Sequence, residues 1–157
     1  MNKGLFSSFL GKGVKIGRGG AESKDGLLLG AYETHIALYN EGEGVIYYQN
    51  AHIKSISQNA KKQLPYNEVL KTVPVADNED FIDLMNSQVR SWVKINRGGP
   101  DKVEGILLEA NPDFVTISSG DEIIYITPFH IKSFSFGEKY EVYEQNNTVS
   151  QTYRRRK

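Results

Sequence analysis

Residues 14–29 read VKIGRGGAESKDGLLL, and residues 93–108 read VKINRGGPDKVEGILL. A second block, HIKSIS at 52–57, returns as HIKSFS at 130–135. Seventeen of about 43 aligned positions are identical, so the chain contains one unit twice. The two copies differ by one residue between these blocks, in a polar stretch that contains glycine in both copies, which predicts a turn there.

Hydrophobic and polar residues alternate within each copy, and a period of two predicts β-strands. We expect five short strands in the first copy, at about 13–18, 26–33, 35–40, 44–49 and 51–57. The second copy should have strands at about 92–97, 105–110, 113–118, 122–127 and 129–136. A helix should precede each copy. Apolar residues from Phe81 to Trp92 recur at helical spacing behind a cap at Asp77 or Asn78, and Leu5 to Leu10 form a weaker candidate.

These patterns divide the chain into four parts: a first repeat at 1–58, a connector at 59–77, a second repeat at 78–137 and a polar C-terminal arm with a basic tail at 138–157. One more strand is a candidate in the connector, from Tyr66 to Val75, and another at 139–144, whereas 145–157 should be disordered. The expected core of the first repeat is Val14, Ile16, Leu28, Ile36, Leu38, Ile46, Ile53 and Ile56. That of the second is Val93, Ile95, Leu107, Val115, Ile117, Ile124, Ile131 and Phe134.

Composition narrows the possible functions. The 157 residues include 19 basic and 19 acidic ones, a balance that gives no general attraction to nucleic acid or membranes. The absence of cysteine excludes disulfides, thiolate zinc sites and cysteine nucleophiles. No apolar run approaches the roughly 20 residues of a membrane-spanning helix, and the N-terminus does not read as a secretory signal. We therefore expect a protein made in a reducing cytoplasm and not secreted.

The Arg-Gly-Gly motif occurs in both copies, as Arg18, Gly19 and Gly20 and as Arg97, Gly98 and Gly99. It is interpreted as a tight turn with glycines at positive φ, and the alternative is a backbone nest that holds an anion. His52 and His130 are equivalent, and each is either a structural turn residue or a group that touches RNA. The acidic residues at 77–83 suit a helix start better than a metal site, so we expect no catalytic, metal or cofactor site.

A short helix followed by five bent antiparallel strands is similar to the Sm-like barrel plan, and the segments 46–49 and 52–57 resemble the second motif of bacterial Sm-like proteins. This resemblance implies two tandem, bent five-stranded barrels whose fourth and fifth strands lie at edges, so that one copy can pair with the other and leave one open edge at each end. A closer one covers nearly the whole chain: the segments 96–100, 103–107 and 129–133 look like the repeated units of the Bacillus spore coat protein B family. It implies a non-enzymatic structural protein of the outer spore coat, made in the mother cell.

The expected function is therefore that of a coat component that associates with itself and with other coat proteins. The tail residues Arg154, Arg155, Arg156 and Lys157 concentrate positive charge on an otherwise acidic chain, so they are expected to tether polyanions such as silica. The alternative function is an Sm-like module that binds RNA or another anion. The acidic body argues against that alternative, because RNA binding needs a basic face.

Overall fold

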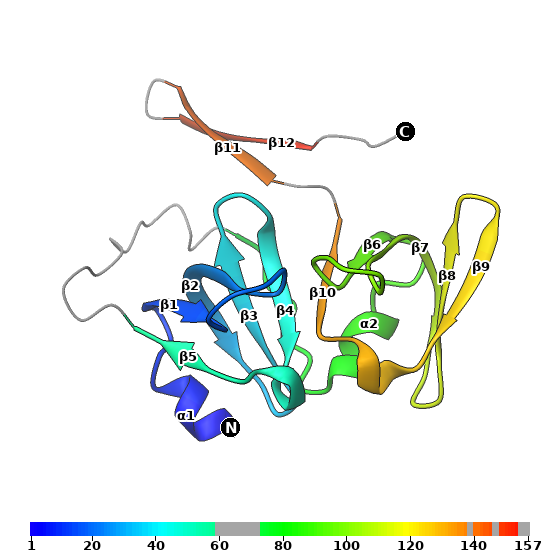
Figure 1. Cartoon of the computed structure of the whole chain (residues 1–157). Coiled ribbons are helices and arrows are strands. Elements are labelled where there is room, and N and C mark those ends of the chain that lie inside the picture. Colours follow the sequence, from blue (N-terminus) through cyan, green and yellow to red (C-terminus); the bar gives the residue numbers. More distant parts are fainter. Residues whose placement is uncertain (59–72, 138–139, 146–147, 154–157) are drawn as a thin grey trace.

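A computed structural model describes residues 1–58, 73–137, 140–145 and 148–153, the last two ranges as backbone only. The first repeat consists of α1 (Lys3–Ser7), β1 (Gly13–Ile16), β2 (Lys24–Ala31), β3 (His35–Asn40), β4 (Gly44–Gln49), the 3-10 helix η1 (Asn50–His52) and β5 (Ile56–Ser57). The second consists of α2 (Phe81–Asn86), β6 (Trp92–Ile95), β7 (Val103–Ala110), β8 (Val115–Ser119), β9 (Glu122–Ile126), η3 (Pro128–His130) and β10 (Ser133–Phe136). The hairpin β11 (Tyr140–Gln145) and β12 (Thr148–Tyr153) follows (Figure 1).

Both repeats use the same strand order and contribute to one antiparallel sheet. The order across the ten strands is β5-β1-β2-β3-β4-β10-β6-β7-β8-β9, so β10 lies between β4 of the first repeat and β6 of its own (Figure 1). The β2–β3 ladder shifts register between Leu28 and Gly30, and the β7–β8 ladder shifts at the equivalent place, between Leu107 and Glu109. Such shifts bend a strand. The duplicated sequence therefore produces a duplicated backbone.

The prediction of a mostly β fold is confirmed, and the strands form one ten-stranded antiparallel sheet in which neither repeat closes into a barrel. Within each repeat the fourth strand does not pair with the fifth: β4 pairs with β10, and β9 ends the sheet. The fifth strands are also shorter than predicted, because η1 and η3 occupy their first residues. Pro128 at the start of η3 favours that turn over an extended strand.

Both helices begin with a side-chain cap. Asn2 Oδ1 accepts a hydrogen bond from the Leu5 amide at 3.0 Å, and Asp80 caps α2 by accepting from the amides of Ile82 and Asp83. The cap of α2 is therefore Asp80 rather than the predicted Asp77 or Asn78. This helix ends at Asn86, so it is shorter than the apolar stripe predicted. Trp92, the last residue of that stripe, belongs to β6 instead.

The predicted cores are buried except at the two outer strands. Seven of the eight residues predicted for each repeat are buried, while Ile56 on β5 and Ile124 on β9 are partly exposed. Both exceptions lie on the end strands of the sheet, which have a neighbour on one side only. Beyond the repeats, β11 confirms the strand expected near 139–144, and β12 contradicts the disorder expected from residue 145 onward. In the connector, 73–75 form no strand, and the rest of the predicted strand lies outside the described residues.

Candidate assembly interface between the repeats

The two repeats meet where β4 pairs with β10, a contact that we call the joint. Tyr48 lies opposite Ser133, and Tyr47 lies opposite Phe134. The Gln49 amide donates to the Lys132 carbonyl at 3.0 Å. The side chain of Gln49 extends the contact, because its Nε2 donates to the Ile131 carbonyl at 2.6 Å. The backbone of β10 thus pairs with the edge of β4, which would otherwise leave its backbone N–H and C=O groups unpaired.

Apolar side chains of the first repeat complete the core of the second at the joint. Tyr47 and Ala37 are buried in the same cluster as Phe81, Leu84 and the other core residues of the second repeat. The ring of Tyr47 stacks on that of Phe136 at a centroid distance of 5.5 Å, and its hydroxyl oxygen accepts a hydrogen bond from the Ala76 amide at 3.0 Å. The second repeat therefore could not lose the first without exposing part of its own core.

A buried charge network lies beside the paired strands. The Arg97 side chain is 1% exposed, and its Nη1 lies 3.1 Å from Glu43 Oε2 of the first repeat. Arg97 Nε donates to Ser133 Oγ at 3.2 Å, and the Arg97 backbone amide and the Ser133 hydroxyl both donate to the Glu22 carboxylate. Partial burial raises the pKa of Glu43, but the hydrogen bond and charge of Arg97, together with the charges of two lysines, outweigh burial and hold this pKa below its usual value. Across the joint, Glu43 thus pairs with the Arg97 guanidinium, and Glu22 accepts a hydrogen bond from the Arg97 backbone amide.

The two Arg-Gly-Gly motifs have different surroundings. Arg97 is buried at the joint, whereas Arg18 is exposed to solvent. Positive φ occurs at the second glycine of each motif, Gly20 and Gly99, and not at the first. Gly98 is instead required by close approach, because a Cβ built there would lie 2.6 Å from Cβ of Ala21 in the first repeat. The anion-nest hypothesis remains a prediction.

The equivalent histidines lie near the joint, in η1 and η3. His52 of the first repeat contacts the Phe129 carbonyl of the second through Nε2, and their rings are 5.2 Å apart. His130 is exposed, and its ring lies 5.3 Å from that of Phe129. His52 therefore contributes to the contact between repeats. Phe129 is 63% exposed in spite of both rings.

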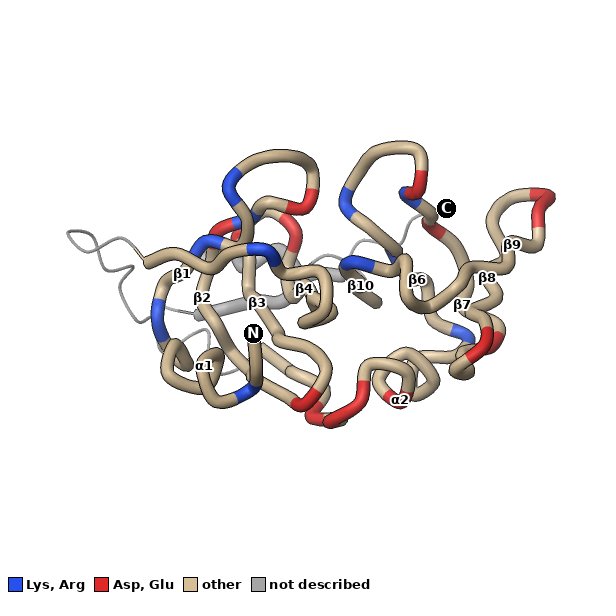
Figure 2. The backbone as a smooth tube through the Cα atoms, turned by 60° about the horizontal axis from the view of Figure 1, so that its bottom comes forward, with Lys and Arg blue, Asp and Glu red and all other residues tan. Residues whose placement is uncertain are grey.

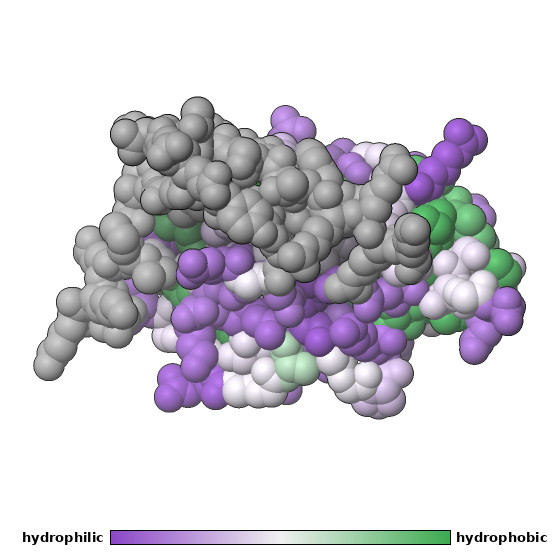
Figure 3. Space-filling model, turned by 90° about the horizontal axis from the view of Figure 1, so that it is seen from above, coloured by the Kyte–Doolittle hydropathy of each residue, from purple (hydrophilic) through white to green (hydrophobic). Residues whose placement is uncertain are grey.

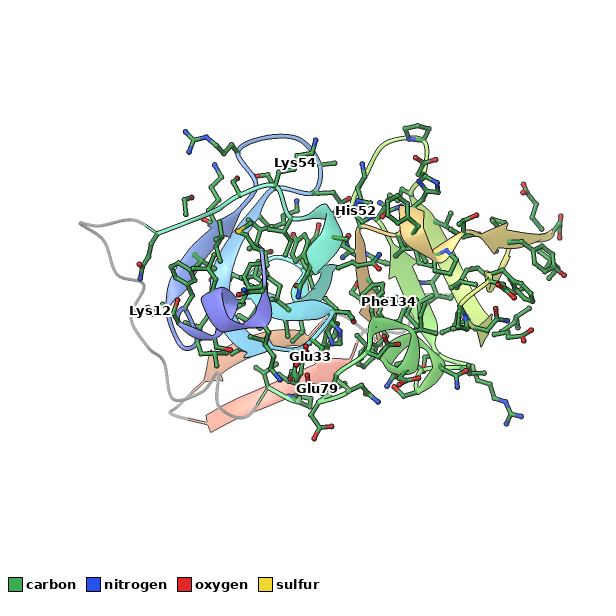
Figure 4. The ribbon with its side chains drawn as sticks, turned by 90° about the horizontal axis from the view of Figure 1, so that it is seen from below. Lys12, Glu33, His52, Lys54, Glu79 and Phe134 are labelled. Atoms are coloured by element: carbon green, nitrogen blue, oxygen red, sulfur yellow. The ribbon has the colours of Figure 1, made fainter. Side chains whose placement is uncertain are left out.

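The acidic residues before α2 also bridge the repeats, at an exposed rim. Lys3 Nζ of α1 lies 3.0 Å from Glu79 Oε2 and 3.6 Å from Glu33 Oε1. The Glu79 carboxylate also accepts from the Glu33 amide at 2.9 Å, and Figure 4 shows Glu33 and Glu79 side by side. Hydrogen bonding to Lys3 and to the Glu33 amide lowers the pKa of Glu79. The acidic run thus supplies one helix cap and one ion pair.

The predicted pairing of the two copies through a fourth and a fifth strand is confirmed by the β4–β10 contact, but the residues that form the joint were not predicted. Tyr47, Gln49, Glu22 and Glu43 all lie in it, and none was a candidate site residue. The repeated Ile-Tyr pair at 46–47 and 124–125 was the signal available, because it repeats an outward-facing aromatic residue on the fourth strand.

The surface of the joint also contains a cleft. This cleft has a volume of about 490 Å³ and is lined by residues that include Glu43, Tyr47, Lys94 and Phe136.

Within the described ranges, no group of three acidic or histidine residues could hold a metal ion, and no helix is long and apolar enough to span a membrane. The predicted tether, Arg154 to Lys157, lies outside the described residues.

Comparison with known proteins gives one informative match. Spore coat protein B of Bacillus subtilis (strain 168) is 37% identical over 147 residues, which make up 91% of this chain and 38% of that protein. The chain thus spans well under half the length of this relative. No family model matches the chain, and no solved structure does.

Proposed function

Because the chain belongs to the spore coat protein B family, we propose that it is a structural protein of the bacterial endospore outer coat. In this proposal it is made in the mother-cell cytoplasm and acts through contacts with itself and with other coat proteins, not through catalysis. The observation that carries the mode of action is the joint, in which a strand edge, a buried tyrosine and an ion pair with a buried arginine hold two copies of one unit together.

The Sm-like plan for each repeat belongs to this proposal. The strand order β5-β1-β2-β3-β4, repeated as β10-β6-β7-β8-β9, leaves the fourth and fifth strands at the two edges of each repeat. Units with complementary edges join head to tail, and one edge stays free at each end of the series. That arrangement supports assembly better than RNA binding, because the Arg-Gly-Gly motif of the second repeat is occupied by two carboxylates.

The location is tested in sporulating cells. A fluorescent fusion of the chain should form a shell around the forespore, and the protein should be recovered in the coat fraction of purified spores. Diffuse fluorescence in the mother cell would contradict a coat function. Light scattering of the purified protein tests self-association separately, and a mass of one chain at high micromolar concentration would contradict that part.

The basic tail is proposed to bind polyanions, silica among them, by releasing counterions, as flexible cationic segments do. The test compares the full chain with a chain that ends at Gln151, in binding to silica particles and to polyphosphate. The full chain should bind more at low salt, and the difference should vanish near about 0.5 M salt, where screening is strong. Equal binding of the two chains at low salt would exclude a tether.

A further inference from the structure

The end of the second repeat exposes the counterparts of residues that are buried or partly buried at the joint. By the repeat, Ile123 and Tyr125 on β9 correspond to Val45 and Tyr47 on β4, and Leu108 on β7 corresponds to Leu29. Tyr47 is 1% exposed, whereas Tyr125 is 68%, Ile123 is 53% and Leu108 is 43% exposed. Figure 3 shows a hydrophobic patch at the end of the molecule formed by β8 and β9. A contiguous exposed apolar patch of this kind marks an interaction site.

The opposite end of the sheet presents the counterpart of the strand that fills the joint. Ser55 and Ile56 correspond to Ser133 and Phe134 of β10, which pair with β4. Strand β5 pairs with β1 along one side and ends the sheet on the other. Both Ser55 and Ile56 are partly exposed. Among the described residues, no strand pairs with the outer edge of β9, a β4-type edge, or with the outer edge of β5, a β10-type edge.

The charges at the two ends are also complementary. Arg18 is the counterpart of Arg97, while Asp101 and Asp121 are the counterparts of its acceptors Glu22 and Glu43. All three of these outer residues are exposed. Figure 2 shows basic residues around β1 at one end and acidic residues at the β8–β9 turn at the other. Arg18 at one end of the molecule and Asp101 and Asp121 at the other thus occupy the positions that Arg97, Glu22 and Glu43 occupy at the joint.

We propose that β9 of one chain pairs with β5 of a second copy of this chain, in a repetition of the joint between molecules. The register follows from the template: Ser55 of one chain lies opposite Ile126 of the other, and Ile56 lies opposite Tyr125. Arg18 of the second copy reaches Asp101 and Asp121 of the first. Because the two surfaces differ, the contact is head to tail and leaves a free edge at each end for further copies.

Cysteine cross-linking tests the register, since the chain has no cysteine of its own. In the template, the Gln49–Lys132 pair carries the backbone hydrogen bond, so Tyr48 and Ser133 form a close, non-hydrogen-bonded pair. Their counterparts should therefore approach closely enough for a disulfide. A mixture of S55C chains and I126C chains, one of them carrying an affinity tag, should form a disulfide-linked dimer that contains one of each. A single chain with both substitutions should form a ladder of multimers.

The matched control moves one cysteine by one residue. Y125C lies on the same strand but points to the other face, so S55C mixed with Y125C should cross-link far more slowly. Equal rates for Y125C and I126C would overturn the proposal. So would homodimers of S55C or of I126C that form as fast as the mixed dimer, because they would indicate a symmetric contact. Circular dichroism of each variant confirms that it is folded.

Sedimentation velocity provides a second test without cysteines. Arg18→Glu should lower the average mass at a fixed concentration, and combining it with Asp121→Arg should restore part of the loss. The proposal rests on the self-association part of the proposed function, and the two fail differently. If wild-type chains oligomerise but neither test responds, this interface is wrong and self-association stands. If wild-type chains stay monomeric at every concentration, both are wrong, and coat localisation is unaffected.

Discussion

Tyr47 and Tyr125 hold equivalent positions in the two repeats, yet Tyr47 is 1% exposed and Tyr125 is 68% exposed. The difference arises from what lies beside each strand. The ring of Tyr47 stacks on Phe136 of the second repeat, whereas β9, which carries Tyr125, is the last strand of the sheet. The same residue type thus supports folding at one position and is available to a partner at the other.

Alanine substitution should separate these roles. Tyr47→Ala removes a buried aromatic ring and a hydrogen-bond acceptor, so it should lower the free energy of unfolding by about 3–5 kcal/mol. Tyr125→Ala should change it by less than about 0.5 kcal/mol, as expected for an exposed site. Urea unfolding followed by circular dichroism measures both. A large loss of stability for Tyr125→Ala would mean that its ring is buried in the isolated chain.

The two arginines of the Arg-Gly-Gly motifs form a second matched pair. Arg97→Ala removes the guanidinium that pairs with Glu43 and donates to Ser133 Oγ, so we expect a loss of about 3 kcal/mol, the lower end for a broken buried pair because Glu43 stays partly in water and keeps Lys24 at 3.6 Å. Arg18→Ala should lie within about 0.5 kcal/mol of wild type in dilute solution.

The same experiment includes a geometric control for Arg97. Lysine keeps the charge but lacks the planar group that reaches Glu43 and Ser133 together, so Arg97→Lys should recover only a small part of the loss. Full recovery by lysine would show that charge alone holds this side of the joint.

Gly98 and Gly19 should respond differently to alanine. A Cβ at Gly98 would lie 2.6 Å from Cβ of Ala21, while a Cβ at Gly19 meets nothing within 4 Å. Gly98→Ala should therefore cost about 1–3 kcal/mol through overpacking, and Gly19→Ala should be close to neutral. Adding Ala21→Gly should rescue Gly98→Ala in thermal unfolding. If the second change brings no rescue, the glycine is needed for a reason other than this contact.

The repeat made most of the strand plan and of the two cores predictable, because alternation identifies which residues face inward. It does not identify which strand lies beside which. Ile56 and Ile124 fit the inward pattern but lie on end strands, and their exposure depends on a neighbour that no local pattern encodes. The pairing of β4 with β10 of the other repeat was expected from the Sm-like plan rather than from any local pattern.

The candidate site was less predictable than the fold. Arg18-Gly19-Gly20 and Arg97-Gly98-Gly99 are identical in sequence, and only the tertiary arrangement buries one arginine and exposes the other. The residues that decide this difference lie in turns of the other repeat: Glu22 belongs to the repeated stretch 14–29 and Glu43 to a polar turn, and neither pattern indicates that it meets Arg97. The β12 strand was missed because its residues, TVSQTY, are mostly polar and have no apolar face.

His35 predicts a dependence of stability on pH. It is fully buried, its ring lies 4.8 Å from that of Tyr32 and 5.7 Å from that of Phe81, and neither ring nitrogen has a hydrogen-bond partner in the part of the chain that the structure describes. Burial lowers the pKa of His35 from 6.5 to about 4, although the charges of Asp80 and Glu79 partly oppose this shift. The folded chain therefore keeps a neutral imidazole where the unfolded chain binds a proton.

Because the unfolded state binds more protons between pH 6.5 and about 4, the His35 contribution to stability is intact above pH 6.5 and is lost as the pH falls through this window. The loss should reach about 3 kcal/mol at the low end, at 1.36 kcal/mol per pKa unit. Phe114 stands at the equivalent, partly exposed position of the second repeat, so His35→Phe is the non-titratable replacement that the repeat suggests. Relative to wild type, this variant should gain stability steadily as the pH is lowered from 6.5 to 4. The exposed control, His130→Phe, should not reproduce that gain in urea unfolding. A constant difference between His35→Phe and wild type across this range would mean that His35 accepts a proton as readily in the fold as in the unfolded chain.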